Sequence, residues 1–268
     1  MDSKIHSTVT YLNGQWEVEH TNIVTEQSVT LTVNTELWLT FMCTPIDLEV
    51  LAIGFLYNEN IIQTKDDIVN LRVCPGGDNI DVWLNSPARK PDKWTRTSGC
   101  SGGETSIIES SVTPVLTKPH NRVIFPPQMI GNLMNQLLKS QDLYKKSGGM
   151  HTSVLCDGER VILTVEDIGR HNTLDKLAGK LLIEQIKPSE PIILTTGRIS
   201  SEMIQKAGRI RASLVISRTS PTSLSIQMAE MLGITMIGYA RHERFIIYAH
   251  PERILTLSTA DRISCEAE

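Results

Sequence analysis

Several glycine-punctuated segments of this chain combine arginine, histidine and hydroxyl side chains, which are groups that bind anions. The most informative segment leaves an apolar run at Val165, turns at Gly169 and enters a helical pattern with Arg170 and His171 in its first turn. In an open α/β sheet, the loop that leaves a strand and opens a helix is the usual place for a ligand, because helix N–H groups favour negative charge. We therefore expect Arg170 and His171 to take part in chemistry on an anionic ligand.

A second histidine, His151, follows Gly148 and Gly149 and leads into the neighbouring strand. A single histidine is most often buried and hydrogen-bonded, but two histidines in loops at adjacent strands favour a shared site. Their roles as metal ligands, general bases or structural side chains stay open at this point. A zinc deaminase would carry His-x-Glu followed by Pro-Cys-x-x-Cys. Neither pattern occurs here, so we expect no catalytic zinc.

The segment Thr195–Ser201 follows another buried strand and opens another helix. Gly197 and Ser200 at a helix N-terminus form a natural phosphate cradle, to which Arg198 adds charge-assisted hydrogen bonds. Ordinary helix capping by Ser200 is the simpler account of that hydroxyl.

A further loop at a strand end combines an aromatic side chain with two arginines. Tyr239 could stack on a planar heterocycle, while Arg241 and Arg244 contact its phosphates; Ala240, His242 and Glu243 complete the loop. Taken alone, this loop is better explained as a charged segment that keeps the end of a sheet soluble.

One cysteine differs from the others in its surroundings. Cys100 lies in the glycine-rich segment 97–103, with Lys93 and Arg96 nearby. A reactive thiol needs exposure and positive surroundings that favour the thiolate, so a nucleophile and an ordinary surface cysteine are equally good interpretations. The other four cysteines, which we interpret as packing or surface thiols, are Cys43, Cys74, Cys156 and Cys265.

The first half of the chain predicts a small α+β unit. Residues 8–42 have the alternation of strands, and a strand pair is expected at 68–73 and 80–84. Between them Thr44, Pro45 and Asp47 predict a capped helix start. The buried face expected for that helix consists of Leu48, Leu51, Ala52, Phe55 and Leu56. We place this domain at residues 1–110, with the Cys100 loop at its end and a boundary within 111–125.

The second half, residues 111–268, predicts an α/β cofactor-binding domain. Apolar periodicity indicates helices at about 128–145, 172–186 and 200–210, with another that starts near Ser220 and stops at Gly233. Short strands are expected at 151–156, 160–165, 192–194, 214–216, 234–238 and 245–248. This order predicts a mixed, mainly parallel sheet sandwiched by helices.

Composition excludes several classes of protein. The chain has 268 residues and a formal net charge of −4, so bulk attraction to nucleic acid or an anionic membrane is not expected. No apolar run approaches the ~20 residues that span a bilayer, and the N-terminus lacks the apolar core of a signal peptide. We expect a cytoplasmic protein that binds anions only through a local cluster.

Taken together and in this order, these segments resemble the FdhD family of formate dehydrogenase accessory proteins. The resemblance covers most of the chain, and its most specific part is the string Asp167-Ile168-Gly169-Arg170-His171-Asn172. It implies a fold similar to the cytidine deaminase core without its zinc, a cofactor-binding loop at Tyr239–Arg244 and a homodimer. It also implies that Cys100 accepts persulfide sulfur from a cysteine desulfurase. The sulfur would then pass to the bis(molybdopterin guanine dinucleotide) form of the molybdenum cofactor, which serves formate dehydrogenase.

One departure from the family pattern leaves two hypotheses open. Many members carry Cys-x-x-Cys in this loop, whereas here Gly103 stands where the second cysteine would be. A single thiol suffices for direct handover of sulfur, which supports a sulfurtransferase. The missing cysteine favours a non-catalytic chaperone that holds the cofactor and docks to the dehydrogenase. A zinc hydrolase is a third, weaker idea.

Overall fold

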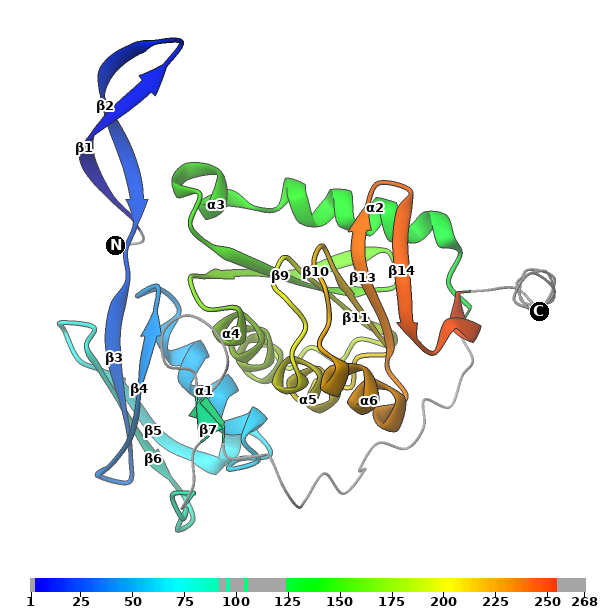
Figure 1. Cartoon of the computed structure of the whole chain (residues 1–268). Helices are drawn as coiled ribbons and strands as arrows, with labels where there is room; N and C mark the ends of the chain where they lie inside the picture. Colours follow the sequence, from blue (N-terminus) through cyan, green and yellow to red (C-terminus); the bar gives the residue numbers. More distant parts are fainter. Residues whose placement is uncertain (1–2, 92–94, 97–103, 106–123, 255–268) are drawn as a thin grey trace.

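The computed structural model describes residues 3–91, 95–96, 104–105 and 124–254. Two larger sheets form its body, one of four strands from the first half of the chain and one of six from the second. Helices α1 (Leu48–Asn58) and α4 (Arg170–Ile183) pack against each other between these sheets (Figure 1). Cys100 and most of the expected boundary 111–125 lie outside the described residues.

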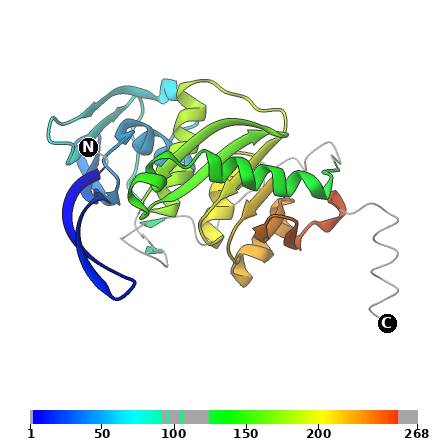
Figure 2. The same cartoon turned by 90° about the horizontal axis from the view of Figure 1, so that it is seen from above.

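The first half begins with a hairpin that projects from the body (Figures 1 and 2). Its strands are β1 (Ser3–Leu12) and β2 (Gln15–Val24), which pair only with each other among the described strands. The four-stranded sheet has the order β4-β3-β6-β5 and supports α1. Its strands are β3 (Gln27–Val33), β4 (Glu36–Cys43), β5 (Ile68–Val73) and β6 (Asn79–Leu84), with the short helix η1 (Lys65–Asp67) before β5. The strands expected in this half are confirmed.

The buried face expected for α1 is confirmed, but its capping signal was wrong. The helix starts one residue after Asp47, which has a left-handed backbone (φ 52°) and caps it without a side-chain hydrogen bond. Asp47 instead pairs with Lys180 of α4 at 3.3 Å. Thr44 is fully buried, and its hydroxyl accepts a hydrogen bond from the amide of Ile168 in the second half of the chain. The hydroxyl therefore does not cap α1.

The six-stranded sheet has the order β10-β9-β11-β12-β13-β14. Its strands are β9 (His151–Asp157), β10 (Arg160–Asp167), β11 (Pro191–Thr195), β12 (Leu214–Ser217), β13 (Thr235–Arg241) and β14 (Arg244–Ala249). The pairings β11·β12 and β12·β13 are parallel, whereas β10·β9, β9·β11 and β13·β14 are antiparallel. The sheet is mixed as expected, but it is not mainly parallel. Tight turns at both ends of the sheet return the chain antiparallel instead of through a helix.

Helices cover both faces of this sheet, which confirms the expected sandwich. Alternate residues of β9 show the division: Val154 and Cys156 pack in the cluster with α2, and Leu155 packs in the cluster with α4, α5 and α6. The remaining helices are α2 (Pro127–Lys139), α3 (Asp142–Ser147), α5 (Ser201–Arg209), α6 (Ser223–Leu232) and the short η2 (Pro251–Arg253). None of the helices in the described part of the chain is long and apolar enough to cross a membrane.

The single helix expected at 128–145 is two helices, α2 and α3. The apolar periodicity continues through the break, so the sequence pattern did not reveal it. The cause is tertiary: the carboxylate of Glu166 accepts hydrogen bonds from the amides of Leu143 (2.7 Å) and Tyr144 (3.0 Å). These amides belong to the first turn of α3, where backbone donors lack helical partners.

The two halves approach most closely where α1 crosses α4. A Cβ atom built on Gly54 would lie 1.7 Å from the carbonyl oxygen of Asp175, and one built on Gly179 would lie 2.0 Å from that of Val50. Only glycine permits this backbone contact. The position of α4, and of the loop at its start, is therefore set by the first half of the chain.

Candidate functional site

The expected site residues of the second half gather at one edge of the six-stranded sheet. The parallel strands β11, β12 and β13 end there, and so does β10, whose last residue Asp167 pairs with His151 at the start of β9. The loops to α4 and α5 leave this edge from neighbouring positions. This arrangement brings His151, Arg170 and Gly197 to one place.

Arg170 is an almost fully buried arginine at this edge. It is the first residue of α4 and only 8% of its surface is exposed. A Cβ atom built on Gly197 would lie 2.8 Å from the Cβ of Arg170, so the loop before α5 lies directly against the arginine side chain. Gly197 therefore serves close packing on Arg170, and Arg198 beside it is exposed.

His171 joins the N-terminal turns of the two helices. Its Nε2 lies 3.2 Å from Ser200 Oγ and 3.0 Å from Glu202 Oε2 on α5. Burial lowers the pKa of His171 below its ordinary value, although Glu202 opposes that shift. Ser200 also caps α5 by accepting from the amide of Met203, which confirms the simpler account of this hydroxyl.

His151 is the first residue of β9 and lies near enough to Arg170 to be affected by its charge. Its Nδ1 is 3.4 Å from the hydroxyl of Thr196, which also accepts the amide hydrogen of Thr152 at 3.0 Å. Burial, followed by the charge of Arg170, lowers the pKa of His151. Both histidines are therefore mainly neutral at pH 7.

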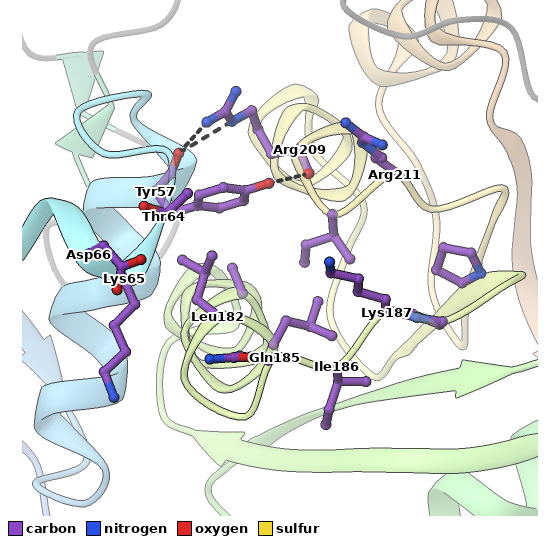
Figure 3. Close-up of a pocket in the computed structure, with 15 residues that line it drawn as sticks. Tyr57, Thr64, Lys65, Asp66, Leu182, Gln185, Ile186, Lys187, Arg209 and Arg211 are labelled. Atoms are coloured by element: carbon purple, nitrogen blue, oxygen red, sulfur yellow. Dashed lines mark hydrogen bonds between the residues drawn. The ribbon is translucent and has the colours of Figure 1, made fainter.

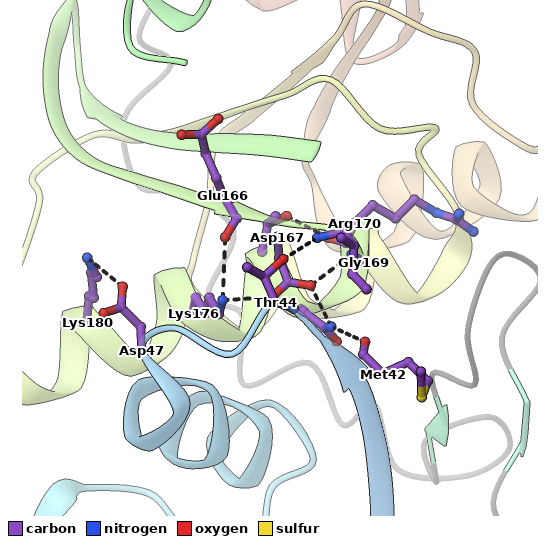
Figure 4. A network of polar contacts seen from close by, with 12 residues as sticks. Met42, Thr44, Asp47, Glu166, Asp167, Gly169, Arg170, Lys176 and Lys180 are labelled. Carbon is purple, nitrogen blue, oxygen red and sulfur yellow. Dashed lines mark hydrogen bonds and ion pairs between the residues drawn. The ribbon is translucent and has the colours of Figure 1, made fainter. Parts of the chain in front are cut away.

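The carboxylate of Asp167 fixes the loop before α4 by hydrogen bonds (Figure 4). Its side chain is fully buried, and its carboxylate accepts hydrogen bonds from Lys176 Nζ (2.7 Å) and from the amide of Gly169 (2.8 Å). It also accepts from Asn172 Nδ2 at 2.8 Å and from the amide of Thr44 at 3.3 Å. The backbone entering α4 is thus fixed by contacts from both halves of the chain.

The loop expected at Tyr239–Arg244 is a β-hairpin, which corrects the prediction. Tyr239 to Arg241 belong to β13, Arg244 opens β14, and only His242 and Glu243 form the turn. The reason is that β13 and β14 extend beyond the strand ends expected at 238 and 245, with pairing as far as Arg241 and Arg244. Ala240 is buried among residues of α2, so only its backbone could contact a ligand. His242 and Glu243 line a surface pocket of about 530 Å³ beside α2.

Tyr239 nevertheless belongs to the same sheet edge as Gly197. Ser217 Oγ donates to the carbonyl of Gly197 at 2.7 Å and lies 3.1 Å from Thr219 Oγ1. The carbonyl of Thr219 in turn accepts the amide of Tyr239 at 3.0 Å. The phenol side chain is 44% exposed and its backbone has a positive φ of 50°. An aromatic group is therefore available at the end of β13, two strands along the sheet from β11, which leads to Gly197.

Cys100 cannot be placed relative to this edge, because residues 97–103 lie outside the described chain. The flanking strands β7 (Thr95–Arg96) and β8 (Glu104–Thr105) are described, and they pair antiparallel.

The sequence matches a known protein family over most of its length. The FdhD/NarQ family matches residues 24–255. The chain belongs to the FdhD/NarQ family.

Several relatives in this family are proteins named sulfur carrier protein FdhD. The chain is 37% identical to the one from Bacillus licheniformis and 36% identical to the one from Bacillus subtilis, over 248 residues that cover 91% of this chain and 94% of each relative. A Staphylococcus aureus protein of the same name is 32% identical over 250 residues, with 92% of this chain and 94% of the relative covered. A crystal structure described as a formate dehydrogenase accessory protein from Desulfotalea psychrophila superposes with a TM-score of 0.73 at 26% identity. That match covers 94% of this chain and 99% of the other.

A second pocket of this FdhD/NarQ member lies far from the Arg170 edge. It has a volume of about 710 Å³ and is lined at the C-terminal ends of α4 and α5 by Leu182, Ile186 and Lys187, among others (Figure 3). Tyr57 Oη donates to the carbonyl of Arg209, and the guanidinium of Arg209 donates to the carbonyl of Tyr57. These reciprocal hydrogen bonds join the two halves of the chain. We therefore assign the contact between Tyr57 and Arg209 a structural role.

Sequence reasoning missed two groups that shape the site. Glu202 contacts His171 from the first turn of α5, and Thr44 reaches the Asp167 loop from β4. The local sequence around Glu202 and Thr44 does not indicate either contact, because each contact joins segments that are distant in sequence. Within the described residues, no three histidine, cysteine, aspartate or glutamate side chains group as a metal site would require.

Proposed function

We propose that this protein is a sulfur carrier in the maturation of formate dehydrogenase. Cys100 carries the sulfur, and the sheet edge around Arg170 binds the bis(molybdopterin guanine dinucleotide) molybdenum cofactor as substrate. The observation that carries the binding part is the convergence of Arg170, Gly197 and the N-terminal turns of α4 and α5 at one edge. The relatives named sulfur carrier protein FdhD support the sulfur-carrying part.

The edge suits a nucleotide with phosphates for electrostatic reasons. Arg170 supplies a guanidinium group, and the N-termini of two helices add N–H donors and positive dipole ends. The half-exposed ring of Tyr239 is available to stack on guanine. Arg198, Arg241 and Arg244 are exposed around this edge and could contact outer phosphates.

Loading of sulfur is an exchange reaction that needs no external oxidant. The Cys100 thiolate attacks the outer sulfur of a persulfide on the donor, a cysteine desulfurase, and the donor's cysteine leaves as a thiolate. Delivery passes that sulfane sulfur to reduced molybdenum of the bound substrate. The metal supplies the two electrons that convert it to sulfide, and the Cys100 thiol is regenerated.

Two other cysteines do not compete for this role. Burial raises the pKa of Cys43 and of Cys156 to about 12, so both stay protonated near neutral pH. A thiol in that state is a poor nucleophile. This leaves Cys100 among the remaining cysteines that could accept sulfur. A homodimer, and formate dehydrogenase as the client, remain predictions from the family.

A non-catalytic cofactor chaperone is the second candidate, and the glycine at position 103 favours it. The two candidates differ in whether Cys100 is needed. In cells that lack the protein, Cys100→Ala restores formate dehydrogenase activity if the protein only holds the cofactor. It fails to restore activity if the protein carries sulfur, which is the result we expect.

The binding site is tested separately with guanosine diphosphate as the probe, using calorimetry on the full chain. We expect Arg170→Gln to bind about tenfold or more weakly, since a charge-assisted hydrogen bond contributes about 1.5–3 kcal/mol. Arg160→Gln, at an exposed position in the β9–β10 hairpin, is the matched control and should bind normally. Equal affinity in both variants would place the nucleotide elsewhere.

A further inference from the structure

The projecting β1–β2 hairpin has one strongly apolar face. The strand register places alternate residues of β1 opposite alternate residues of β2, with Val9 facing Val18 and Tyr11 facing Trp16. Ile5 lies on the same face by the period of two. These five side chains are between 61% and 72% exposed. The hairpin thus presents to solvent the kind of side chains that normally form a core.

The opposite face of the hairpin is polar and internally bonded. Thr8 Oγ1 lies 2.7 Å from Thr21 Oγ1, and Thr10 donates to Glu19 at 3.0 Å. The formal charges of the two strands, those of Lys4, Glu17 and Glu19, all lie on this face. The apolar face also carries polar residues, namely Ser3, Ser7, His20 and Asn22, but no Asp, Glu, Lys or Arg. A matching surface would therefore be largely uncharged.

The exposed area is large enough for a specific interface but small for a permanent one. A buried aromatic side chain covers about 150–250 Å², so five large side chains present on the order of 700 Å². A stable protein–protein interface takes about 800 Å² from each partner, and obligate dimers take more. An isolated two-stranded hairpin is also only marginally stable in water. The area favours a partner that binds this face transiently.

The hairpin stands next to the candidate site. Its last residue, Val24, lies on the apolar face, and its Cγ1 would be 3.0 Å from a Cβ on Gly149. Gly149 comes two residues before His151, and β2 also packs against α3. Figures 1 and 2 show the rest of the hairpin extending beyond the body from this point. The family match begins at residue 24, which is the last residue of the hairpin.

We propose that the apolar face of the β1–β2 hairpin is a docking arm for the enzyme that receives the cofactor. This inference rests on the proposed function, because the recipient must approach the edge that holds the cofactor, and the base of the arm adjoins that edge. The partner surface is an uncharged apolar strip. A two-fold contact between two copies of this chain would bury both arms, so measurement in the ultracentrifuge separates that arrangement from docking to the enzyme.

The test measures binding of the full chain to purified, cofactor-free formate dehydrogenase by biolayer interferometry. Trp16→Thr with Val18→Thr removes two of the five exposed apolar side chains, including the largest, and keeps strand-forming residues. We expect it to weaken binding about tenfold or more, as loss of a central anchor does. The matched control, Gln15→Thr with Glu17→Thr, changes the opposite face of the same strand and should bind as the native chain does. Equal binding by the two double variants overturns the proposal.

Two further measurements separate the possible failures. Hydrogen exchange on the native complex should protect residues 3–24, and an unprotected hairpin overturns the proposal without any variant. If the apolar-face variant turns a dimer into a monomer in the ultracentrifuge but binds the dehydrogenase normally, the face joins two copies and the proposal is wrong. Guanosine diphosphate binding should be unchanged in the apolar-face variant. A native chain that fails to bind this probe instead counts against the proposed function.

Discussion

The backbone amide of Thr44 donates a hydrogen bond to Asp167 Oδ2 at 3.3 Å, although the two residues are 123 positions apart. The Thr44 hydroxyl accepts the amide of Ile168 at 3.2 Å in return. These bonds connect the end of β4 to the loop that opens α4, where Arg170 and His171 lie (Figure 4). The first half of the chain therefore positions the binding residues of the second half.

Thr44→Val should destabilise the protein while preserving side-chain volume. The substitution leaves the amide of Ile168 without its acceptor, and an unsatisfied polar group in this position costs about 1–3 kcal/mol. Urea unfolding measures the loss. Thr40→Val, at an exposed position of β4, should change the free energy of unfolding by less than about 0.5 kcal/mol. Similar effects of the two substitutions would show that the bond to Ile168 contributes little.

Gly54→Ala should separate α1 from α4. The added methyl would overlap the carbonyl of Asp175, which is backbone and cannot rotate away. Overpacking of this kind costs about 1–3 kcal/mol or more, and it should also weaken guanosine diphosphate binding because α4 shifts. Gly76→Ala, whose methyl would meet only the flexible side chain of Asp78, is the control. An unchanged melting temperature for Gly54→Ala would contradict the close helix contact.

Acid should destabilise the fold through the two site histidines. Burial holds the pKa of His171 and of His151 below the ordinary value of 6.5. Below pH 6.5 the unfolded chain therefore binds more protons than the folded chain, and stability falls as the pH decreases toward the folded pKa values. Melting temperatures measured from pH 7.5 to pH 5 should fall, and His171→Gln should flatten that decline. A decline of unchanged slope would mean that His171 is not buried in its neutral form.

Selective alkylation should distinguish the buried thiols. Cys43 and Cys156 are buried, and burial raises the pKa of each to about 12. Iodoacetamide should therefore leave both unmodified in the folded protein and modify both in urea, as mass spectrometry of the peptides would show. Rapid labelling of either thiol without denaturant would mean that its strand opens readily.

Local patterns predicted much of the fold. Alternation predicted the strands of the first half, short apolar runs predicted those of the second, and helical periodicity predicted the buried face of α1. These signals depend on neighbouring residues. The break between α2 and α3 depends on hydrogen bonds to the carboxylate of Glu166. Thr44 does not cap α1 because its hydroxyl accepts a hydrogen bond from the amide of Ile168. Contacts of this kind join distant segments, so no window of sequence reveals them.

The candidate site was predicted only in part for the same reason. Arg170, His171, Gly197 and Ser200 were found from their position after strands, and the sheet does bring them together. The role of Gly197 as a close packing partner of Arg170 required the structure. The segment from Tyr239 to Arg244 looked like a loop because its polar residues hide the alternation of a twisted hairpin, in which Tyr239 has a positive φ.

Sulfur loading is the central claim, and mass spectrometry of the full chain after incubation with a cysteine desulfurase and cysteine tests it most directly. If Cys100 carries sulfur, the peptide that contains it gains the mass of one sulfur atom, and a reductant removes that sulfur. Cys100→Ser should gain none at that position. If Cys100→Ser acquires as much protein-bound sulfur as the native chain, the carrier role assigned to Cys100 is wrong.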